Sequence, residues 1–401
     1  MPKPTMPVPS VIEIHGSVIS RIRERVRTAI EEVAEEELKT ALGADAYERS
    51  SDRRGYRNGD QVRSVVTEYG PTELRLPRGR LFTERGTEEW RSSVVPRYQR
   101  RTRKVDEAIL GTYLAGANSR RIRKALQPLL GERALSKSSI SRVVSRLKER
   151  FVEWRQRDLA DESYVYLFLD AMFLPVRMAR RVVKVPVQAV IGVDEQGHKV
   201  LLALEIAASE STASWKAIVE GLRDRGLRPP VLVILDGNAG LCRAVRDTWP
   251  TTKLQRCTRH KLENLLAKAP KHSHAELKRD YHAISHAESA AMAKSAYQAF
   301  VRKWSKLSSE VVKSLEEAGS ELLTFTQFPK SQWKSLRTTN VIERVNGEFR
   351  RRTKTQGAFC NESAALVVLF GLFAMGQIQL RRIDGYEDMS KVVRSNLQAA
   401  A

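Results

Sequence analysis

The stretch YVYLFLDAMFLPVR, residues 164–177, decides how the second half of the chain is interpreted. Aliphatic and aromatic residues follow one another as in a β-strand up to Asp170, and apolar residues resume beyond it as Met172, Phe173 and Leu174. A carboxylate in such surroundings loses its hydration, so a partner must offset the cost. We therefore expect Asp170 to have a functional partner.

Strand patterns continue after this stretch. Residues 185–194 and 199–207 form two further strands, with a turn at Asp194–Gly197, which predicts an antiparallel meander. A helix over 212–225 then precedes VLVILD, residues 231–236, a second apolar run that meets an aspartate. The remaining elements are a short helix, a strand-like KLQRC, a basic helical stretch from about 261 to 335, and helices over 338–380. This order is that of an α/β core of ribonuclease-H-like fold.

The composition favours a nucleic-acid partner. The 401 residues are enough for two or three domains, and the net charge of +22 with a pI of about 10.1 indicates a polyanionic ligand, DNA or RNA ahead of a membrane. The first ten residues, MPKPTMPVPS, lack the apolar region of an export signal. The apolar stretch 364–376 is too short to span a bilayer. Three cysteines indicate free thiols in a reducing compartment, so we expect a cytoplasmic protein.

The N-terminal part, residues 1–95, is expected to contain a helix and a small β-hairpin used in DNA binding or assembly. Helical spacing covers residues 18–42, and Gly43 marks the helix end. Residues 53–80 are rich in arginine. Their period-two spacing (Val62 and Val66, then Leu74 and Leu76) predicts a hairpin with its turn at Asn58-Gly59.

Residues 96–158 are expected to form a helix-turn-helix domain. Between residues 97 and 150 there are fifteen Lys and Arg and four Asp and Glu, a net charge of +11 that is half the total. In ALSKSSISRVVSRLKER, residues 134–150, Ser136 is a candidate N-cap and an apolar stripe follows it: Ile140, Val143, Val144 and Leu147. The polar residues Ser138, Ser139, Arg142 and Arg146 lie largely away from this stripe. The alternatives are a DNA-reading helix and an ordinary amphipathic surface helix.

The two acids that follow strands suggest metal chemistry. Neighbouring strands can hold two strand-end carboxylates side by side, where they repel each other. Mg²⁺ removes that repulsion, because it binds one or two carboxylates together with water and phosphate oxygens. The alternative for each acid is a helix cap or a turn, and Asp236-Gly237-Asn238 has the composition of a turn.

A third acid is expected from LRTTNVIERVNGEFRRRTK, residues 336–354. Glu343 and Glu348 are five positions apart, about 140° around a helix, so only one of them can face the site. Glu343 shares a face with Asn340 and Gly347. It also stands three residues after Asn340, as in a capping box, so a purely structural role stays open.

Three segments, LFLDAMFLPVR, LDGNAGLCRAV…WP…LQRCTRHKLENLLAKAPK and RTTNVIERVNGEFRRRTK, together resemble the Mutator superfamily of DDE transposases of bacterial insertion sequences. YRNG, LRLPRGR and GANSRRIRKALQPLLG…LSKSSISRVV are similar to the N-terminal half of that family. The resemblance implies a ribonuclease-H-like catalytic domain over 159–401, with an all-helical insertion at about 261–335. It also implies a triad of Asp170, Asp236 and Glu343 that binds Mg²⁺, which Mn²⁺ can replace.

The resemblance includes a Cys-x-x-His signature, matched here by Cys257 and His260. A His near the metals, touching the scissile phosphate or orienting a carboxylate, is one interpretation, and half of a zinc site is the other. Zinc takes four ligands, and the further ones would have to come from His272, His274, His282 or His286, so no zinc is expected. Cys257 is then expected to pack as a small buried hydrophobe near the site.

Double-stranded DNA, in the form of terminal repeats and target, is the expected partner, bound by two copies of the chain. The expected DNA contacts are Ser139, Arg142, Arg146, Arg177, Arg337, Asn340, Arg350, Arg351 and Arg352. Trp304 and Trp333 could stack on an unpaired base, although core packing is the commoner role of such residues. Three functions compete: a transposase, a non-catalytic DNA-binding protein, and a ribonuclease-H-like nuclease.

Overall fold

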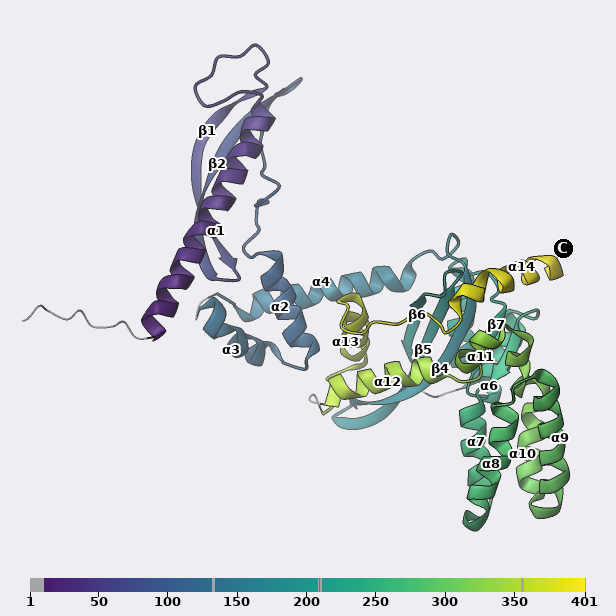
Figure 1. Ribbon diagram of the computed structural model, residues 1–401. Coiled ribbons are helices and arrows are strands. Elements are labelled where there is room, and N and C mark those ends of the chain that lie inside the picture. The colour runs from purple at the N-terminus through teal and green to yellow at the C-terminus, as the bar shows by residue number, and fades with distance from the viewer. Residues whose placement is uncertain (1–10, 132–133, 208, 210, 355–356, 401) are drawn as a thin grey trace, which may run out of the picture. The chain divides into compact units, whose positions relative to one another are not determined.

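The computed structural model describes residues 11–131, 134–207, 209, 211–354 and 357–400. The ten N-terminal residues, in which we found no export signal, lie outside the described residues. The chain forms two compact units, one ending at Arg146 and the other beginning at Leu147 (Figure 1). None of the helices within the described ranges has the length and hydrophobicity needed to cross a bilayer.

The first unit begins with a long helix packed on a three-stranded sheet. Helix α1 (Val11–Leu42) ends at Gly43, whose φ of +66° confirms the expected helix end. Strands β1 (Gly55–Thr67), β2 (Gly70–Thr83) and β3 (Gly86–Glu89) pair antiparallel in the order β1-β2-β3. The core between α1 and the sheet consists of apolar side chains from both, namely Ala34, Leu38, Val65, Leu74 and Leu76.

The expected hairpin forms, but its turn was placed wrongly. Thr67 pairs with Gly70, so the two-residue turn is Glu68-Tyr69. Asn58 and Gly59 lie inside β1 as a bulge, opposite a single residue of β2, with Gly59 at φ +70°. Asn-Gly has the backbone freedom that both a turn and a bulge require, so its composition alone could not distinguish them.

Three helices complete the first unit: α2 (Arg103–Leu114), α3 (Ser119–Leu130) and α4 (Lys137–Gln156), the last of which extends beyond Arg146. Ile140 and Val143 of α4 are buried against α2 and α3, as the apolar stripe predicted. Ser136 accepts a hydrogen bond from the backbone N–H of Ser139 (3.1 Å), as expected of an N-cap.

The second unit contains a five-stranded mixed sheet. Its strands, in chain order, are β4 (Tyr164–Met178), β5 (Arg181–Asp194), β6 (Lys199–Ile206), β7 (Leu232–Leu235) and β8 (Lys253–Arg256). They stand in the order β6-β5-β4-β7-β8. The first three are antiparallel, which confirms the predicted meander, whereas β7 pairs parallel to β4 and β8 parallel to β7.

Helices cover both faces of this sheet. Helices α5 (Thr212–Asp224) and α6 (Ala239–Thr248) pack on one face, where Trp215, Leu222 and Val245 meet Leu167 and Leu169 of β4. Helices α12 (Asn340–Thr353) and α13 (Glu362–Ala374) contact β4 as well. Because side chains alternate along a strand, Asp170 points away from the α5 and α6 side.

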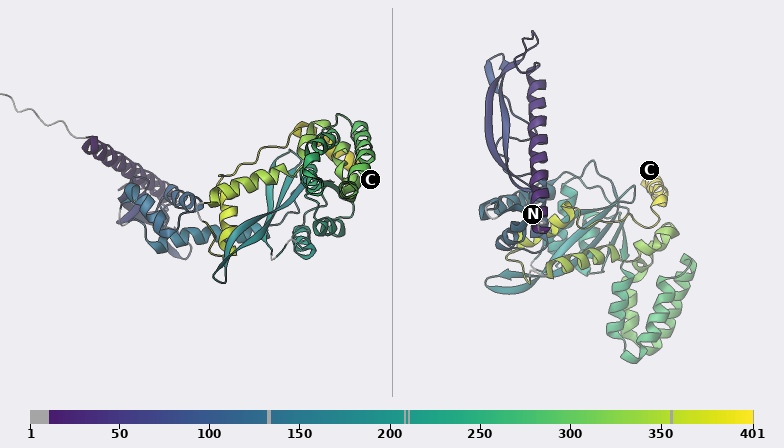
Figure 2. Two further views of the ribbon diagram at one scale, coloured as in Figure 1. Left: turned by 90° about the horizontal axis from the view of Figure 1, so that it is seen from below. Right: turned by 60° about the vertical axis from the view of Figure 1, so that its left-hand side comes forward.

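A helical segment with its own core separates β8 from α12, as the sequence predicted for residues 261–335. It contains α7 (Thr258–Lys268), α8 (His274–Ser285), α9 (Ala290–Leu307) and α10 (Ser309–Ala318), a cluster of helices beside the sheet (Figure 2). Short helical turns then lead to α11 (Trp333–Leu336), and α14 (Met389–Ala400) follows α13 near the chain end. Trp304 is fully buried in this core, and the Nε1 of Trp333 donates to the carbonyl of Phe328 (2.8 Å), so both tryptophans pack.

Candidate active site

The parallel pairing of β4 with β7 sets Asp170 and Asp236 level with each other. The last pair of this ladder is Leu169 with Leu235, and the two aspartates come next on each strand. Only Asp236 stands at a strand end. Asp170 is internal to β4, which continues to Met178 because β5 pairs with it along its whole length, so the expectation of two strand-end acids was wrong for Asp170.

Asp170 is buried, with 7% of its surface exposed. One carboxylate oxygen accepts a hydrogen bond from the backbone N–H of Ala171 (2.8 Å). The pKa of Asp170 is raised to about 7, chiefly by burial; His260 opposes this rise, and the negative charges of Asp236 and Glu343 add to it. The fold therefore holds a carboxyl group at a place where its charge is poorly compensated.

Asp236 begins a tight turn into α6. Its Oδ1 accepts the backbone N–H of Asn238 (2.9 Å), and the Asn238 side chain caps the helix by accepting from Gly240 and Leu241. Asn238, rather than Asp236, is thus the helix cap. Gly237 has φ +96°, and a Cβ there would lie 2.3 Å from the guanidinium of Arg256, so only glycine fits.

Arg256 connects this turn to the helical segment. Its side chain is 6% exposed, and its Nη2 donates to Glu317 of α10 (2.7 Å). Lys261 of α7, also buried, donates to the other oxygen of Glu317 (2.6 Å). Glu317 therefore partners two buried cations, and Glu321 lies 4.0 Å from Arg256 as a further carboxylate from the helical segment.

Helix α12 brings Glu343 to the two aspartates. Its Oε2 pairs with Arg259, and its Oε1 lies 3.6 Å from the Nε2 of His260. Glu348 lies elsewhere on the helix and pairs with Arg351 and Arg352. The N-cap residue of α12, Thr339, makes no side-chain capping bond, so Glu343 is not part of a capping box.

The Cys-x-x-His element holds the sheet and α12 together. Cys257 follows β8 directly, and its sulfur accepts hydrogen bonds from the N–H (3.4 Å) and the hydroxyl (3.5 Å) of Thr339. The Thr258 N–H donates to the carbonyl of Arg337 (2.9 Å). Cys257 is fully buried, as expected, but it is a hydrogen-bond acceptor and not simply a small hydrophobe.

His260 is positively charged at neutral pH. The neighbouring Cys257 sulfur raises the pKa of this imidazole to about 9 against the effect of burial, and Asp170 and Asp236 contribute in the same direction. Burial alone would raise the pKa of the Cys257 thiol, but its hydrogen bonds with His260 and Thr339 lower it overall. A cationic imidazole next to three acids could donate a hydrogen bond to an anionic ligand.

The donor chemistry at this site fits a divalent cation only in part. Asp170 and Asp236 offer the oxygen ligands that Mg²⁺ prefers, and their mutual repulsion is what such an ion removes. Glu343 is engaged by Arg259. Across the described residues, no group of three or more His, Cys, Asp and Glu side chains is arranged to hold a metal ion.

The other residues expected to contact DNA differ in how free their side chains are. Arg177, Asn340 and Arg350 are exposed. Arg337 donates to the carbonyl of Ser285 (2.9 Å), and Arg352 donates to that of Gln377 (2.7 Å), so both also have structural roles.

On α4, Arg142 is exposed, and Ser139 is partly exposed and bonded to Ser136. Arg146 forms an ion pair with Asp106 of α2 (2.6 Å), and the same carboxylate binds Arg101 (2.8 Å). Arg146 therefore joins two helices, whereas Arg142 has no ion-pair partner in the part of the chain that the structure describes.

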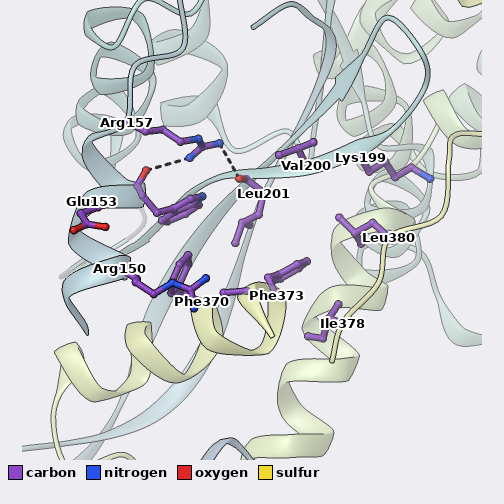
Figure 3. Close-up of a pocket in the computed structure, with 12 residues that line it drawn as sticks. Arg150, Glu153, Arg157, Lys199, Val200, Leu201, Phe370, Phe373, Ile378 and Leu380 are labelled. Atoms are coloured by element: carbon purple, nitrogen blue, oxygen red, sulfur yellow. Dashed lines mark hydrogen bonds between the residues drawn. The ribbon is translucent and has the colours of Figure 1, made fainter. Parts of the chain in front are cut away.

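A separate cleft of about 630 Å³ lies between α4, β6 and α13 (Figure 3). Trp154, Phe370 and Leu201 line it, and Arg157 lies at its rim. Arg157 donates to the carbonyls of Trp154 (3.1 Å) and Leu201 (3.4 Å). The second bond covers part of the free edge of β6, which protects an edge strand against unwanted pairing. None of the acids discussed above lines this cleft.

Sequence reasoning missed three residues of the site. Arg259 pairs with Glu343, Thr339 binds Cys257, and Arg256 supports the Asp236 turn. All three lie within or next to the motifs already singled out, RCTRH and RTTN. Their proximity to those motifs was the only available signal, since their partners come from distant parts of the chain.

Known proteins resemble this chain along most of its length. A family model described as the Mutator family of transposases matches residues 12–379. The transposase of insertion sequence element ISRM5 from Rhizobium meliloti (strain 1021) is 34% identical over 345 residues, 86% of this chain and 85% of that protein. The transposase of IS905 from Lactococcus lactis subsp. lactis (strain IL1403) is 32% identical over 361 residues, 89% of this chain and 90% of that protein.

Two further matches are more distant. The transposase of IS256 in transposon Tn4001 from Staphylococcus aureus is 29% identical over 361 residues, 89% of this chain and 90% of that protein. Among solved structures, the Drosophila P element transposase strand transfer complex matches with a TM-score of 0.28 and 11% identity, covering 74% of this chain and 85% of that one. A similarity this low supports no argument about fold or mechanism.

Proposed function

This chain belongs to the Mutator family of transposases of bacterial insertion sequences, and from that premise we propose that it cleaves and joins DNA at the element's ends. The reaction is metal-dependent strand cleavage followed by strand transfer, on a core of ribonuclease-H-like fold. The strand order β6-β5-β4-β7-β8, with a three-stranded meander followed by parallel strands, supports this assignment of the core.

Asp170, Asp236 and Glu343 are the proposed metal ligands. One observation carries the proposal: Asp170 and Asp236 lie level on parallel strands, and the charges of Asp236 and of Glu343 from α12 both raise the pKa of the buried Asp170. Arg259 holds Oε2 of Glu343, so a metal would bind Glu343 through Oε1, or through both oxygens once Arg259 releases it. Mg²⁺, or Mn²⁺ in its place, would activate the attacking oxygen and stabilise the leaving one.

The remaining side chains act on the phosphodiester. Cationic His260 donates a hydrogen bond to a non-bridging oxygen of the scissile phosphate, and Arg259, once free of Glu343, adds a second positive donor. Water attacks the phosphorus first, and the P–O3′ bond breaks to leave a 3′-hydroxyl. That hydroxyl then attacks a phosphodiester of the target DNA, forming one P–O bond while another breaks.

Recognition of the terminal repeats is proposed for the first unit. Arg142 and Ser139 on α4 read bases, and cations of both units hold phosphates. The proposed set on the catalytic side is Arg177, Arg337, Asn340, Arg350, Arg351 and Arg352. Two copies of the chain bring two element ends together.

Substitution of the acids in the full chain tests this proposal. Asp170→Asn, Asp236→Asn and Glu343→Gln should each lower Mg²⁺-dependent cleavage of an end-containing duplex by at least about 10³-fold. Binding of the same duplex should change little. Glu348→Gln, on the same helix, is the matched control and should cleave normally.

Two results would contradict the assignment. If Glu343→Gln kept its cleavage activity and Glu348→Gln lost it, Glu348 would replace Glu343 as the proposed metal ligand. Wild-type protein that cleaves but never joins ends to a target would instead be a nuclease, and one that binds without cleaving would be a DNA-binding protein.

A further inference from the structure

The ribbon formed by β4 and β5 extends beyond the rest of the second sheet (Figures 1 and 2). β7 stops pairing with β4 at Leu169, and β6 stops pairing with β5 at Val187. From Leu174 on β4 and Val185 on β5 outward the two strands therefore pair only with each other, apart from one short bridge between Val176 and Phe359. We call residues 172–185 the arm.

The arm carries four cations without compensation. Arg177, Arg180, Arg181 and Lys184 are all exposed, and residues 172–185 contain no Asp or Glu. Within the described ranges none of the four has an ion-pair partner. Cations elsewhere in the same unit do find partners, as Arg155 does with Glu205 (2.5 Å). The arm thus presents unpaired positive charge that a bound polyanion would compensate.

One face of the arm also exposes apolar side chains. Phe173 is 53% exposed and Val182 is 55% exposed. Val182 pairs with Arg177 across the ribbon, so apolar and cationic side chains share this face. The opposite face is buried at Leu174 and Val176. Phe359 pairs separately with the edge of β4, where its N–H donates to the carbonyl of Pro175 and its carbonyl accepts from the N–H of Arg177. One face is anchored to the protein and the other is open.

The tip turn keeps side chains where glycine is usual. Met178 pairs with Arg181, so Ala179 and Arg180 form a two-residue turn, with φ of +44° and +68°. Such a turn favours Gly, Asn or Asp, because other residues rarely adopt positive φ. Arg180 therefore occupies an unfavourable conformation that places its guanidinium at the exposed end of the arm.

From these observations we propose that the arm enters a groove of double-stranded DNA during the reaction. This inference rests on the proposed function and assigns it a DNA contact outside the helix-turn-helix. A two-stranded ribbon, with strands about 4.8 Å apart, fits the major groove, which is about 12 Å wide. The cations reach phosphates on both walls, and Phe173 and Val182 meet base edges.

The position of the arm relative to Asp170 fits this role. Arg177 is seven residues beyond Asp170 on one strand, about 23 Å at strand geometry, which is shorter than one turn of DNA. DNA held by the arm would therefore pass the acids within the same helical turn. A second copy of the arm is a poorer partner, because in a two-fold contact its four cations would face four more.

Tethered cleavage tests where the arm lies. Cys360 is the exposed thiol among the three cysteines, so Ala179→Cys in a Cys360→Ser background carries a single accessible site for an iron chelate. Hydroxyl radicals from the tip should cut both strands of an end-containing duplex within about one turn of the scissile phosphate. Asp224→Cys, at the C-terminal end of α5, is the control and should not cut there.

Salt dependence tests the charges. Arg180→Ala/Arg181→Ala should reduce the slope of log affinity against log salt by about 2, since each lost phosphate contact contributes about 0.9. Arg223→Ala/Arg228→Ala, two exposed cations near the C-terminal end of α5, should leave the slope unchanged.

The outcomes separate this inference from the proposed function. A wild-type protein that cleaves element ends while the arm variants bind with unaltered slope overturns the arm's role alone. A disulfide between two copies of the Ala179→Cys variant, without cuts in DNA, also overturns it and makes the arm a protein interface. Wild-type protein that binds no DNA overturns both proposals.

Discussion

The inner and outer halves of β4 differ in how their charges are compensated. In the inner half, Asp170 is buried near Asp236 and Glu343, and the charge of His260 opposes the charges of these two acids. The groups that act on the charge of Asp170 there all belong to the protein itself. In the outer half, Arg177 and the cations facing it across the ribbon are exposed and have no carboxylate partners within the described residues. One strand thus joins a site with excess negative charge to an arm with excess positive charge.

This difference shows that pairing, and not charge density, identifies the cations available to a ligand. The segment 97–150 has the larger net charge, yet Arg101 and Arg146 share Asp106, and Arg103 pairs with Glu107 (2.9 Å). The arm has only four cations, and none of them has an ion-pair partner among the described residues. Exposed ion pairs add little stability, but they do occupy the cation.

The largest expected effect concerns the inner half. Between pH 3.8 and about 7 the unfolded chain releases the proton of Asp170 while the folded chain retains it, so stability falls as pH rises through this window. Asp170→Asn removes this penalty. At pH 8 without metal it should raise the free energy of unfolding by up to about 4 kcal/mol, as measured by urea denaturation.

The gain should shrink towards pH 4, where the wild-type carboxyl is protonated in both states. Mg²⁺ sharpens the test: at a hundred times its dissociation constant it should stabilise wild-type protein by about 2.7 kcal/mol and the variant far less. Equal stability of the two proteins at pH 8 would mean that Asp170 is not penalised by its surroundings.

A smaller effect distinguishes the arm from α4. Arg142→Ala should lose about 1–3 kcal/mol of preference for repeat DNA over random DNA, because a base contact carries sequence information. Arg180→Ala/Arg181→Ala should weaken binding to both duplexes alike, as expected for phosphate contacts. Competition binding at fixed salt measures the ratio, and equal losses in the two proteins would remove Arg142 from base reading.

The smallest effect is expected at the tip. Ala179→Gly relieves a positive φ and should raise the free energy of unfolding by roughly 0.5–1 kcal/mol. Arg180 and Arg181 are unchanged in this variant, so the slope of log affinity for DNA against log salt should not change. Thermal denaturation with parallel binding titrations checks both statements, and a loss of stability would show that the turn is not strained in the wild-type protein.

Local patterns predicted much of the fold, because its elements are regular. The meander, the helices after β8 and the apolar stripe of α4 follow from periodicity that each segment carries by itself. The position of Asp170 inside β4 could not be predicted, since it depends on how far β5 pairs with it. The same holds for Asn58-Gly59, whose bulge is set by the register with β2.

The candidate site, too, could be predicted from the sequence only in part. Asp170, Asp236 and Glu343 stood out from their flanking strands and motif, but the choice between Glu343 and Glu348 needed the direction in which α12 faces. The roles of Arg259 and Thr339 depend on partners about eighty residues away in the chain. A capping box at the start of α12 would use Asn340 and Glu343, the same residues that the structure places in α12 without such a box. The sequence of this segment alone therefore could not exclude the capping box.

The contact between Gly237 and Arg256 makes the helical segment an inseparable part of the sheet domain. Arg256 and Lys261 are buried cations that both depend on Glu317 of α10, more than fifty residues further along the chain. Replacing the segment by a short loop would remove Glu317 and leave the buried Arg256, next to the Asp236 turn, without this carboxylate partner. The insertion is therefore not an exchangeable module: grafting, shortening or circular permutation within α7–α10 would disturb the turn that holds Asp236 as well as the helices.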